Sequence, residues 1–466
     1  METNNQQQGK FGKWVKTSIT ARMGMVGFLV VILLIPLSYI QDLITERTSR
    51  QQEVVNEINQ KWGKEVLLYG PILKIPYKTY HKKTIINQQT KELQTETVEK
   101  IKYAYFFPEK LDITSTINPE EKKRGIYKTA VYKSNIAING SFTSPDFSEI
   151  DLDKKDIVWE KARMIMETSN LKGVNSLVEI KLNKKSYSFT SKYQGAKRGN
   201  QNKYNQFNLQ PVELHILESK FIAKENLPIK NNIQFSMNIN INGSKQIRFI
   251  PVGKETLVTI KSDWKTANFL GEYIPYNSDK ITNTGFNAKW KILEINRPFS
   301  QQSFNGIPNL LHYAFGVNFM IPVDEYQKSE RSIKYGFLVI GLTFLIFFLI
   351  QTMSKIHIHP FQYLMIGIAL TMFYTLLISI SEHSSYLKAY IIAGISVVSL
   401  ITFYSKSILK SAKFTSFIGV SLSILYGFIF VIIQLENYAL LVGSIGLFVI
   451  LSAVMYTSRK IDWQND

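Results

Sequence analysis

Long uncharged runs divide this chain into parts suited to a membrane and a part suited to water. A bilayer core about 30 Å thick needs roughly 20 residues of α-helix, and a soluble helix is rarely uncharged on every face. Six runs of suitable length fall at 23–41, 335–354, 360–381, 389–405, 414–435 and 437–458. The pattern therefore predicts six transmembrane helices, one N-terminal and five C-terminal.

The lysines and arginines beside these runs predict the orientation of the helices. Cations concentrate in residues 1–22, in the short loops after the second and fourth spans, and in the tail 459–466. By the positive-inside rule these segments are cytoplasmic, so both termini are expected inside. A cleavable signal peptide is the alternative for the first run. That run is long for a signal peptide, and no small-residue cleavage site follows it, which favours an uncleaved anchor.

The large segment between the first and second spans is then expected in the periplasm. Residues 42–62 lack Gly and Pro and have apolar residues near helical spacing, which predicts a juxtamembrane helix. Residues 63–330 contain many short alternating runs bounded by Gly, Asn, Pro or Asp, which predicts an antiparallel β-rich, sandwich-like domain. One helix is expected near 156–166, and the basic segment 192–204 is expected to be an exposed loop. The predicted fold class is an α+β membrane protein, with 335–458 as a five-helix block.

Composition narrows the expected partners. The net charge is +19, from 55 Lys+Arg against 36 Asp+Glu. This excess indicates an anionic neighbour such as lipid headgroups, nucleic acid or an acidic envelope polymer, or else a general bias of the chain toward lysine. With six expected spans we predict an integral membrane protein whose partners are envelope components or envelope proteins, and no nucleic acid. Cysteine is absent, which excludes thiol chemistry and Cys-ligated zinc.

Sequence signatures of catalysis are missing. The chain has no G-x-S-x-G, no P-loop, no G-x-G-x-x-G after a predicted strand and no H-E-x-x-H. His357 and His359 are close enough to share a metal, although polar residues at a membrane interface are the commoner explanation. We therefore assign no catalytic, cofactor-binding or metal-ligating residue. An enzyme assembled from residues distant in the chain stays open, because triads are defined by geometry rather than order.

Charged residues gather at the expected outer ends of the spans. They are Arg331, Lys334, Glu382, His383, Lys388 and Glu436. Opposite charges at one depth predict a polar network in which Arg331 or Lys334 pairs with Glu382 or Glu436. In the alternative, each side chain extends separately to the headgroups. No ionisable residue is expected in mid-membrane, where a coupled transporter usually has one, and this disfavours transport.

Several long motifs resemble the CreD family of bacterial inner-membrane proteins over nearly the whole chain. They are KWGKEVLLYGPILKIPY at 61–77, KKRGIYKTAVY at 122–132, GFNAKWKI at 285–292, FGVNFMIPVDEYQKSERSIKYG at 315–336, HPFQYLMIGIALTMFYTLLISISEH at 359–383 and QLENYALLVGSIGLFVILSAVMYTSRKIDW at 434–463. The resemblance implies a cell-envelope integrity protein, associated with a two-component regulon, whose β domain lies in the periplasm. It brings no catalytic residues. Asn437 departs from the Glu-Asp of the family pattern.

The leading hypothesis is a non-enzymatic inner-membrane protein whose basic periplasmic β domain contributes to envelope integrity or to an envelope stress response. Two alternatives are a multispan transporter or flippase and a membrane-tethered periplasmic hydrolase. A polar cavity across the membrane would favour transport, and a deep periplasmic pocket with converging carboxylates or a Ser-His pair would favour hydrolysis. The sequence predicts no oligomeric state.

Overall fold

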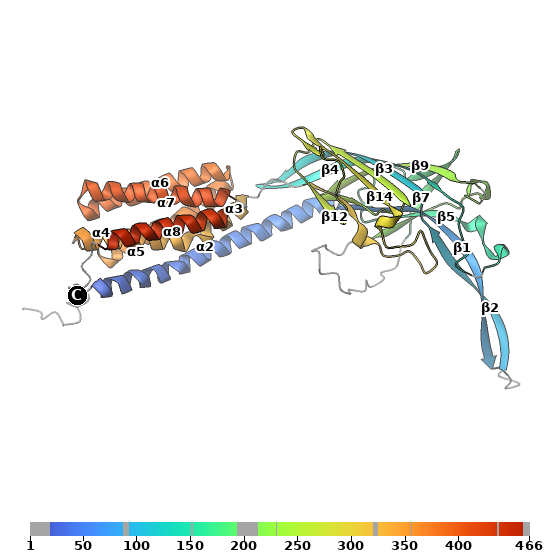
Figure 1. The fold of residues 1–466 in the computed structure, drawn as a ribbon, viewed down its shortest axis with the longest axis horizontal. Coiled ribbons are helices and arrows are strands. Elements are labelled where there is room, and N and C mark those ends of the chain that lie inside the picture. The colour runs from blue at the N-terminus through green and yellow to red at the C-terminus, as the bar shows by residue number, and fades with distance from the viewer. Residues whose placement is uncertain are drawn as a thin grey trace, which may run out of the picture. The chain divides into compact units, whose positions relative to one another are not determined.

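The computed structural model describes residues 19–86, 93–150, 152–192, 213–229, 231–319, 325–354, 356–435 and 438–459. The chain separates into two compact units, a helical unit of Met1–Glu53 with Val323–Asp466 and a β unit of Val54–Pro322. Six of the described helices are long and apolar enough to cross a membrane, one before the β unit and five after it. The fold class predicted from the sequence is therefore confirmed (Figure 1).

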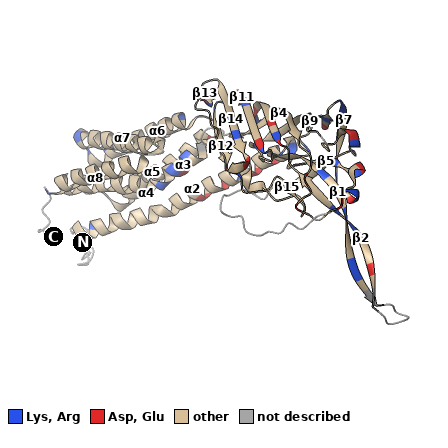
Figure 2. Cartoon of the chain, turned by 45° about the vertical axis from the view of Figure 1, so that its right-hand side comes forward, with Lys and Arg blue, Asp and Glu red and all other residues tan. Residues whose placement is uncertain are grey.

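The helical unit is built from long apolar helices and one short polar helix. Their bounds are α2 Ile19–Trp62, α3 Glu325–Lys334, α4 Gly336–Ser354, α5 Pro360–Ser381, α6 Tyr386–Leu409, α7 Ala412–Gln434 and α8 Ala439–Ser458. Figure 2 shows α4–α8 with few charged residues along their length, whereas α3 carries several. This distribution is the one that a bilayer favours, because a charge at its centre is costly.

Glycines let the first span pack closely against the later ones. A side chain at Gly367 in α5 would collide with Leu33 of α2, and one at Gly336 in α4 would collide with Leu37. Leu33 and Leu37 are buried in the core that α2 shares with α4 and α5. Small residues at such contacts allow helix backbones to approach, which is how helices associate where lipid removes the hydrophobic driving force.

The β unit contains sixteen strands within the described residues. Their bounds are β1 Val66–Ile86, β2 Leu93–Phe106, β3 Lys110–Arg124, β4 Tyr127–Phe142, β5 Arg163–Thr168, β6 Glu179–Leu182, β7 Lys185–Ser191, β8 His215–Ser219, β9 Ile233–Ser244, β10 Gln246–Phe249, β11 Glu255–Ser262, β12 Ala267–Gly271, β13 Ile281–Thr282, β14 Gly285–Leu293, β15 Gln302–Ser303 and β16 Phe315–Phe319. Their main path is β12-β16-β10-β1-β5-β8-β7-β6-β9-β4-β3-β11-β14-β13, and off this path β2 pairs with β1 and β15 pairs with β2.

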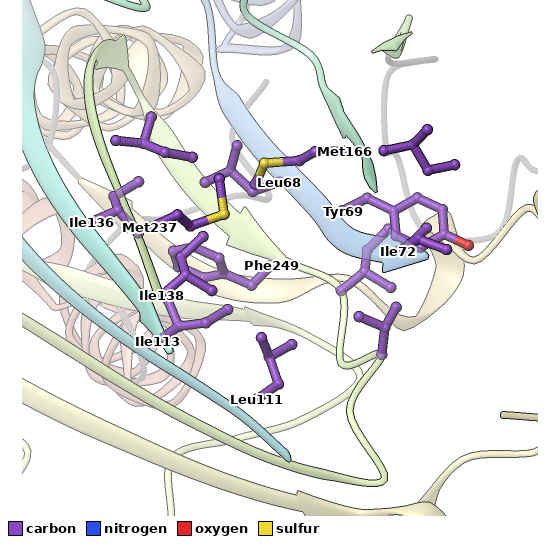
Figure 3. Packing of buried hydrophobic residues seen from close by; sticks show 14 of the residues in the cluster. Leu68, Tyr69, Ile72, Leu111, Ile113, Ile136, Ile138, Met166, Met237 and Phe249 are labelled. Carbon is purple, nitrogen blue, oxygen red and sulfur yellow. The ribbon is translucent and has the colours of Figure 1, made fainter. Parts of the chain in front are cut away.

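The strand β7 joins the two halves of this sheet, because it pairs with β8 on one side and with β6 on the other. The halves enclose one core: Leu68 of β1 and Met166 of β5 lie near Ile136 of β4 and Met237 of β9 (Figure 3). Along β3 and β9 buried and exposed residues alternate, as expected for strands with one face on a core. The sandwich-like arrangement predicted from the sequence is thus present as two facing halves of a continuous sheet.

A two-stranded ribbon extends beyond this core. The antiparallel register of β1 and β2 runs from Leu73 opposite Phe106 to Ile86 opposite Leu93, and Figure 1 shows the distal part of the pair reaching past the other strands of the unit. The exposed side chains of the ribbon include Tyr80 and Ile101. Isolated two-stranded ribbons are marginally stable in water, so the buried base of the ribbon must hold it in register.

Two features differ from the sequence-based prediction. The helix expected near 156–166 is wrong: two 3₁₀ turns, Lys154–Asp156 and Trp159–Lys161, are followed by the strand β5. Pairing on both sides with β1 and β8 buries Met164 and Met166, and this tertiary pairing overrides the helix propensity of the segment. Helix α3 was not predicted. Of the expected loop 192–204, all but Lys192 lies outside the described residues.

Candidate functional site at one end of the helical unit

Glu382 follows the last turn of α5 and meets two segments that are far apart in the chain. Its Oε1 lies 3.5 Å from Nε of Arg47 on α2, and it accepts a hydrogen bond of 3.2 Å from the hydroxyl of Tyr326 on α3. The Glu382 side chain is 15% exposed, and Tyr326 is buried. Arg47 precedes the β unit in the chain and Tyr326 follows it. One carboxylate therefore binds both chain connections to the inserted domain.

Helical periodicity explains why Arg47 reaches this site. Leu33, Leu37 and Ile44 are buried along one stripe of α2, and Arg47 continues that stripe one turn beyond Ile44. Residues three and four apart share a face of a helix, so Arg47 is directed toward the same neighbours as the apolar stripe. Glu382 is fixed by its backbone, whose N–H donates to the carbonyl groups of Ile378 and Ile380.

Helix α3 is joined to α6 beside this pair. The hydroxyl groups of Ser332 and Tyr386 lie 2.6 Å apart, and both residues are buried. The ammonium group of Lys328 lies 5.9 Å from the centre of the Tyr386 ring, within the range of a cation–π contact. The Tyr386 ring in turn contacts Tyr390 and Phe430 at centroid distances of 5.7 and 6.5 Å. The polar helix α3 is thus bound to a cluster of aromatic side chains, Tyr386, Tyr390 and Phe430, inside the helical unit.

The six residues selected from the sequence do not all meet. Lys334 pairs with Glu330 on its own helix at 2.9 Å, and both side chains are exposed. Within the described part of the chain, neither Arg331 nor Lys334 forms an ion pair with Glu382. The i,i+4 spacing favours Glu330 as the partner of Lys334, and the Glu382 carboxylate is already bound to α2.

The remaining members of the predicted network are scattered. His383 is exposed in the turn after α5, and Lys388 is exposed in the first turn of α6. Glu436 lies outside the described residues. Sequence reasoning missed Arg47 and Tyr326, although the apolar stripe of α2 was a signal for Arg47. A network of all six residues stays a prediction.

The β unit contains a second charged cluster, centred on Glu218 of β8. Its carboxylate accepts from Lys74 at 2.9 Å, from Lys192 at 2.8 Å and from Arg163. Burial opposes the charged form of Glu218. Hydrogen bonds from Lys192 and Lys74, together with the charges of Lys74 and Arg163, nevertheless lower its pKa to about 2. Glu218 is therefore an anion at every physiological pH, and its oxygens are occupied by cations.

Glu167 of β5 lies in a contrasting environment. It stands opposite Tyr69 of β1, is 9% exposed, and has no hydrogen-bond or ion-pair partner among the residues that the structure describes. Burial alone raises its pKa to about 7. Two carboxyl groups whose pKa values are pushed apart are typical of acid–base sites. The occupied oxygens of Glu218 argue against that use here, because such a site needs a carboxylate open to substrate.

Metal binding finds no support in the described ranges, which contain no group of three or more His, Asp or Glu residues able to hold an ion. His359 instead caps α5: its Nδ1 accepts a hydrogen bond of 3.2 Å from the backbone N–H of Phe361. His357 is exposed in the preceding turn. A histidine that caps a helix uses one ring nitrogen for that purpose, and this explains the residue without a metal.

These features define a class, the polytopic helical membrane protein with a β domain inserted between its first and second spans. The family described as inner membrane protein CreD matches residues 18–464, and the chain belongs to that family. It is also 28% identical to the inner membrane protein CreD of Escherichia coli (strain K12) over 440 residues, which cover 93% of this chain and 91% of that protein. The chain is accordingly a multi-pass inner membrane protein. Neither description names an enzymatic activity.

Proposed function

We propose that the protein is a non-enzymatic structural component of the cell envelope, which anchors a periplasmic β domain to the inner membrane. The observation that carries this proposal is the position of Glu382, bound to Arg47 before the β unit and to Tyr326 after it. A connection held at both ends transmits a load on the domain to the membrane helices. This is what a protein of envelope integrity or of an envelope stress response requires.

The charge pattern supports a periplasmic β unit. Lys406, Lys410, Lys413 and Arg459 lie near the helix ends that the positive-inside rule assigns to the cytoplasm. Glu382 and His383 lie in the connection between α5 and α6, at the end of α6 that is opposite to Lys406. The C-terminal end of α2 leads into the β unit. With the N-terminal end of α2 in the cytoplasm, alternation places that unit outside.

The basic character of the domain supports contact with acidic envelope components. The β1–β2 ribbon provides a surface for such a contact, because it carries exposed Lys82, Lys83 and Lys100 beside exposed Tyr80 and Ile101. Tyrosine and basic side chains together suit a polar, anionic polymer or the rim of a partner protein.

Complementation of a strain that lacks the gene tests the proposal. The wild-type protein and the Glu330→Ala variant should both restore resistance to bile salts and retention of a periplasmic enzyme. The Glu382→Ala variant should restore neither, at equal abundance in the membrane. Full rescue by Glu382→Ala would show that the connection is not needed. If rescue by the variants instead correlates with their uptake or export of a solute, the alternative of a multispan transporter would be favoured.

A further inference from the structure

A groove lies between α6 and α7 of the helical unit. It has a volume of about 540 Å³ and lies among Leu387, Tyr390, Gly394 and Val398 of α6 and Gly427 and Phe430 of α7. Several lining residues are exposed, among them Leu387 and Gly427, so the groove opens outward from the unit. In a membrane this opening faces lipid.

Two glycines create the groove. A Cβ atom added at Gly394 or at Gly427 would meet no atom within 4 Å. Glycines nearby are closely covered: a Cβ at Gly419 of α7 would lie 3.1 Å from Thr402, and one at Gly446 of the neighbouring α8 would collide with Phe428. Gly394 and Gly427 therefore leave open space in the groove, where the helices lack side chains to fill it.

The length of the groove matches one leaflet of a bilayer. Along α6 the lining runs from Leu387, beside the helix start, to Ser399, near the helix middle. At 1.5 Å per residue this distance is about 18 Å, a little over half of a hydrocarbon core about 30 Å thick. A transmembrane helix from a second copy would need a groove along both leaflets. A single acyl chain needs only this one.

Two lysines lie close to residues that line or adjoin the groove. Lys388 is exposed next to Leu387. Lys328 lies 5.9 Å from the centre of the Tyr386 ring, which stacks with the groove-lining Phe430. Within the part of the chain that the structure describes, neither lysine is in an ion pair. Basic pockets between transmembrane helices are suited to anionic lipid headgroups.

We propose that this groove binds one acyl chain of an anionic glycerophospholipid, with the headgroup at Lys388 and Lys328. The chain occupies the space beside Gly394 and Gly427, and Tyr390 and Phe430 form the aromatic wall near the headgroup. The acyl groove lies between α6 and α7, whereas Glu382 joins α2 and α3 to α5. The groove therefore adds a specific lipid ligand to the proposed structural role.

Photolabelling of the full-length protein in nanodiscs tests the acyl site. The nanodiscs contain phosphatidylcholine and a trace of phosphatidylglycerol with a diazirine near the end of one acyl chain. Peptides from α6 and α7 that line the groove should be labelled. Gly427→Leu and Gly394→Leu place a side chain in the groove at positions where an added Cβ meets no atom within 4 Å, and they should abolish this labelling. The matched control is Gly341→Leu on α4, where an added Cβ also meets nothing within 4 Å, and it should label like the wild type.

Competition tests the headgroup. Unlabelled phosphatidylglycerol should displace the probe from the groove better than phosphatidylcholine does. Lys388→Ala with Lys328→Ala should remove that preference, whereas Lys406→Ala, near the other end of α6, should keep it. Equal competition by both lipids in the wild type would overturn the anionic assignment. The proposal would also be overturned if the groove is not labelled and if Gly427→Leu abolishes a dimer that native mass spectrometry detects for the wild type. That result would show that a second copy fills the groove.

Discussion

The guanidinium Nε of Arg47 lies 3.5 Å from the carboxylate of Glu382, although the whole β unit separates the two residues in the chain. The Glu382 side chain is largely shielded from water, and that of Arg47 is 37% exposed. Partial exposure weakens the ion pair through solvent screening, but it does not remove the specificity of the contact. The contact therefore orients α2 against α5 more than it stabilises the unit.

A double-mutant cycle should reveal this pair. Arg47→Ala and Glu382→Ala are expected to show a coupling energy of about 0.5–1 kcal/mol, since the exposed arginine is screened by water. Thermal unfolding of the full chain in nanodiscs measures it. Arg331→Ala is the control and should be additive with Glu382→Ala. Coupling of Glu382 to Arg331 as large as that to Arg47 would contradict the arrangement described here.

The Tyr326 hydroxyl should contribute to stability through its hydrogen bond to the Glu382 carboxylate, because the acceptor is charged. Tyr326→Phe removes a donor to a charged acceptor at a buried position, so the loss of stability is expected to be about 1.5–3 kcal/mol. The same thermal assay applies. Tyr276→Phe, an exposed tyrosine of the β unit, should change stability little. Equal effects of the two substitutions would mean that the Tyr326 hydroxyl is not bonded to Glu382 in the membrane.

The membrane architecture follows directly from the sequence. A continuous apolar run that crosses lipid forms an α-helix, because a helix satisfies its own backbone hydrogen bonds. Predicted spans such as 335–354 and 360–381 accordingly coincide with α4 and α5. The β-rich character of residues 63–330 was also predicted, because alternation such as that along β9 and β11 is a direct consequence of burying one face of a sheet.

The elements that the sequence did not predict are those whose conformation depends on tertiary contacts. The sequence RMIMET of β5 lacks alternation, since both faces are buried, and its strand state depends on pairing with β1 and β8. Helix α3 has only ten residues and a polar composition, so its hydrogen bonds to Glu382 and Tyr386 were invisible in the sequence. Long-range pairs of this kind cannot be read from spacing along a chain.

The candidate site was predicted in location but not in its partners. Glu382 was selected because it lies at the end of a predicted span. In the structure it contacts Arg47. Arg47 follows the first span, so charges near the last five spans did not include it. The signal for Arg47 was its register with Leu37 and Ile44 on α2. Reading helix faces across the full length of a span, rather than only its ends, would have identified it.

Orientation is testable with introduced cysteines, because the chain has none of its own. Single cysteines at Thr3, Ser411 or Asn465 should be shielded from an impermeant thiol reagent in intact spheroplasts, and one at Gly199 should react. Permeabilised cells provide the control, in which all four positions should react. Labelling at Ser411 from outside would overturn the topology in which both termini are cytoplasmic.

Glu218 is expected to stabilise the β unit strongly. Glu218→Gln leaves Lys74 and Arg163 as largely buried cations without their anion, which should destabilise the unit by about 3 kcal/mol. Hydrogen exchange of the β5 and β8 peptides in the full chain measures this loss. Glu120→Gln, whose partners are exposed lysines, should change the exchange little, because water screens these pairs. Unchanged exchange in Glu218→Gln would show that the three cations do not depend on it.

The two carboxyls should give the unit opposite dependences on pH. The folded pKa of Glu218 is lowered, so its contribution is complete above the unfolded value and is lost as the pH falls toward 2. The folded pKa of Glu167 is raised to about 7, so the folded state binds more protons than the unfolded state between about 4.5 and 7. Stability from Glu167 therefore decreases as the pH rises through that window.

Glu167→Gln should remove this second dependence. At pH 8–9 the wild type buries a carboxylate without a partner, whereas the neutral amide avoids that cost. The variant should then be more stable than the wild type by an amount on the order of 3 kcal/mol, and the two should be similar near pH 4.5. Hydrogen exchange of the β5 peptide from pH 5 to 9, corrected for the intrinsic rates, measures the difference. Glu160→Gln at an exposed position is the control and should follow the wild type throughout. An equal loss of protection with pH in wild type and Glu167→Gln would show that Glu167 ionises with an ordinary pKa, and that water reaches this position in the folded protein.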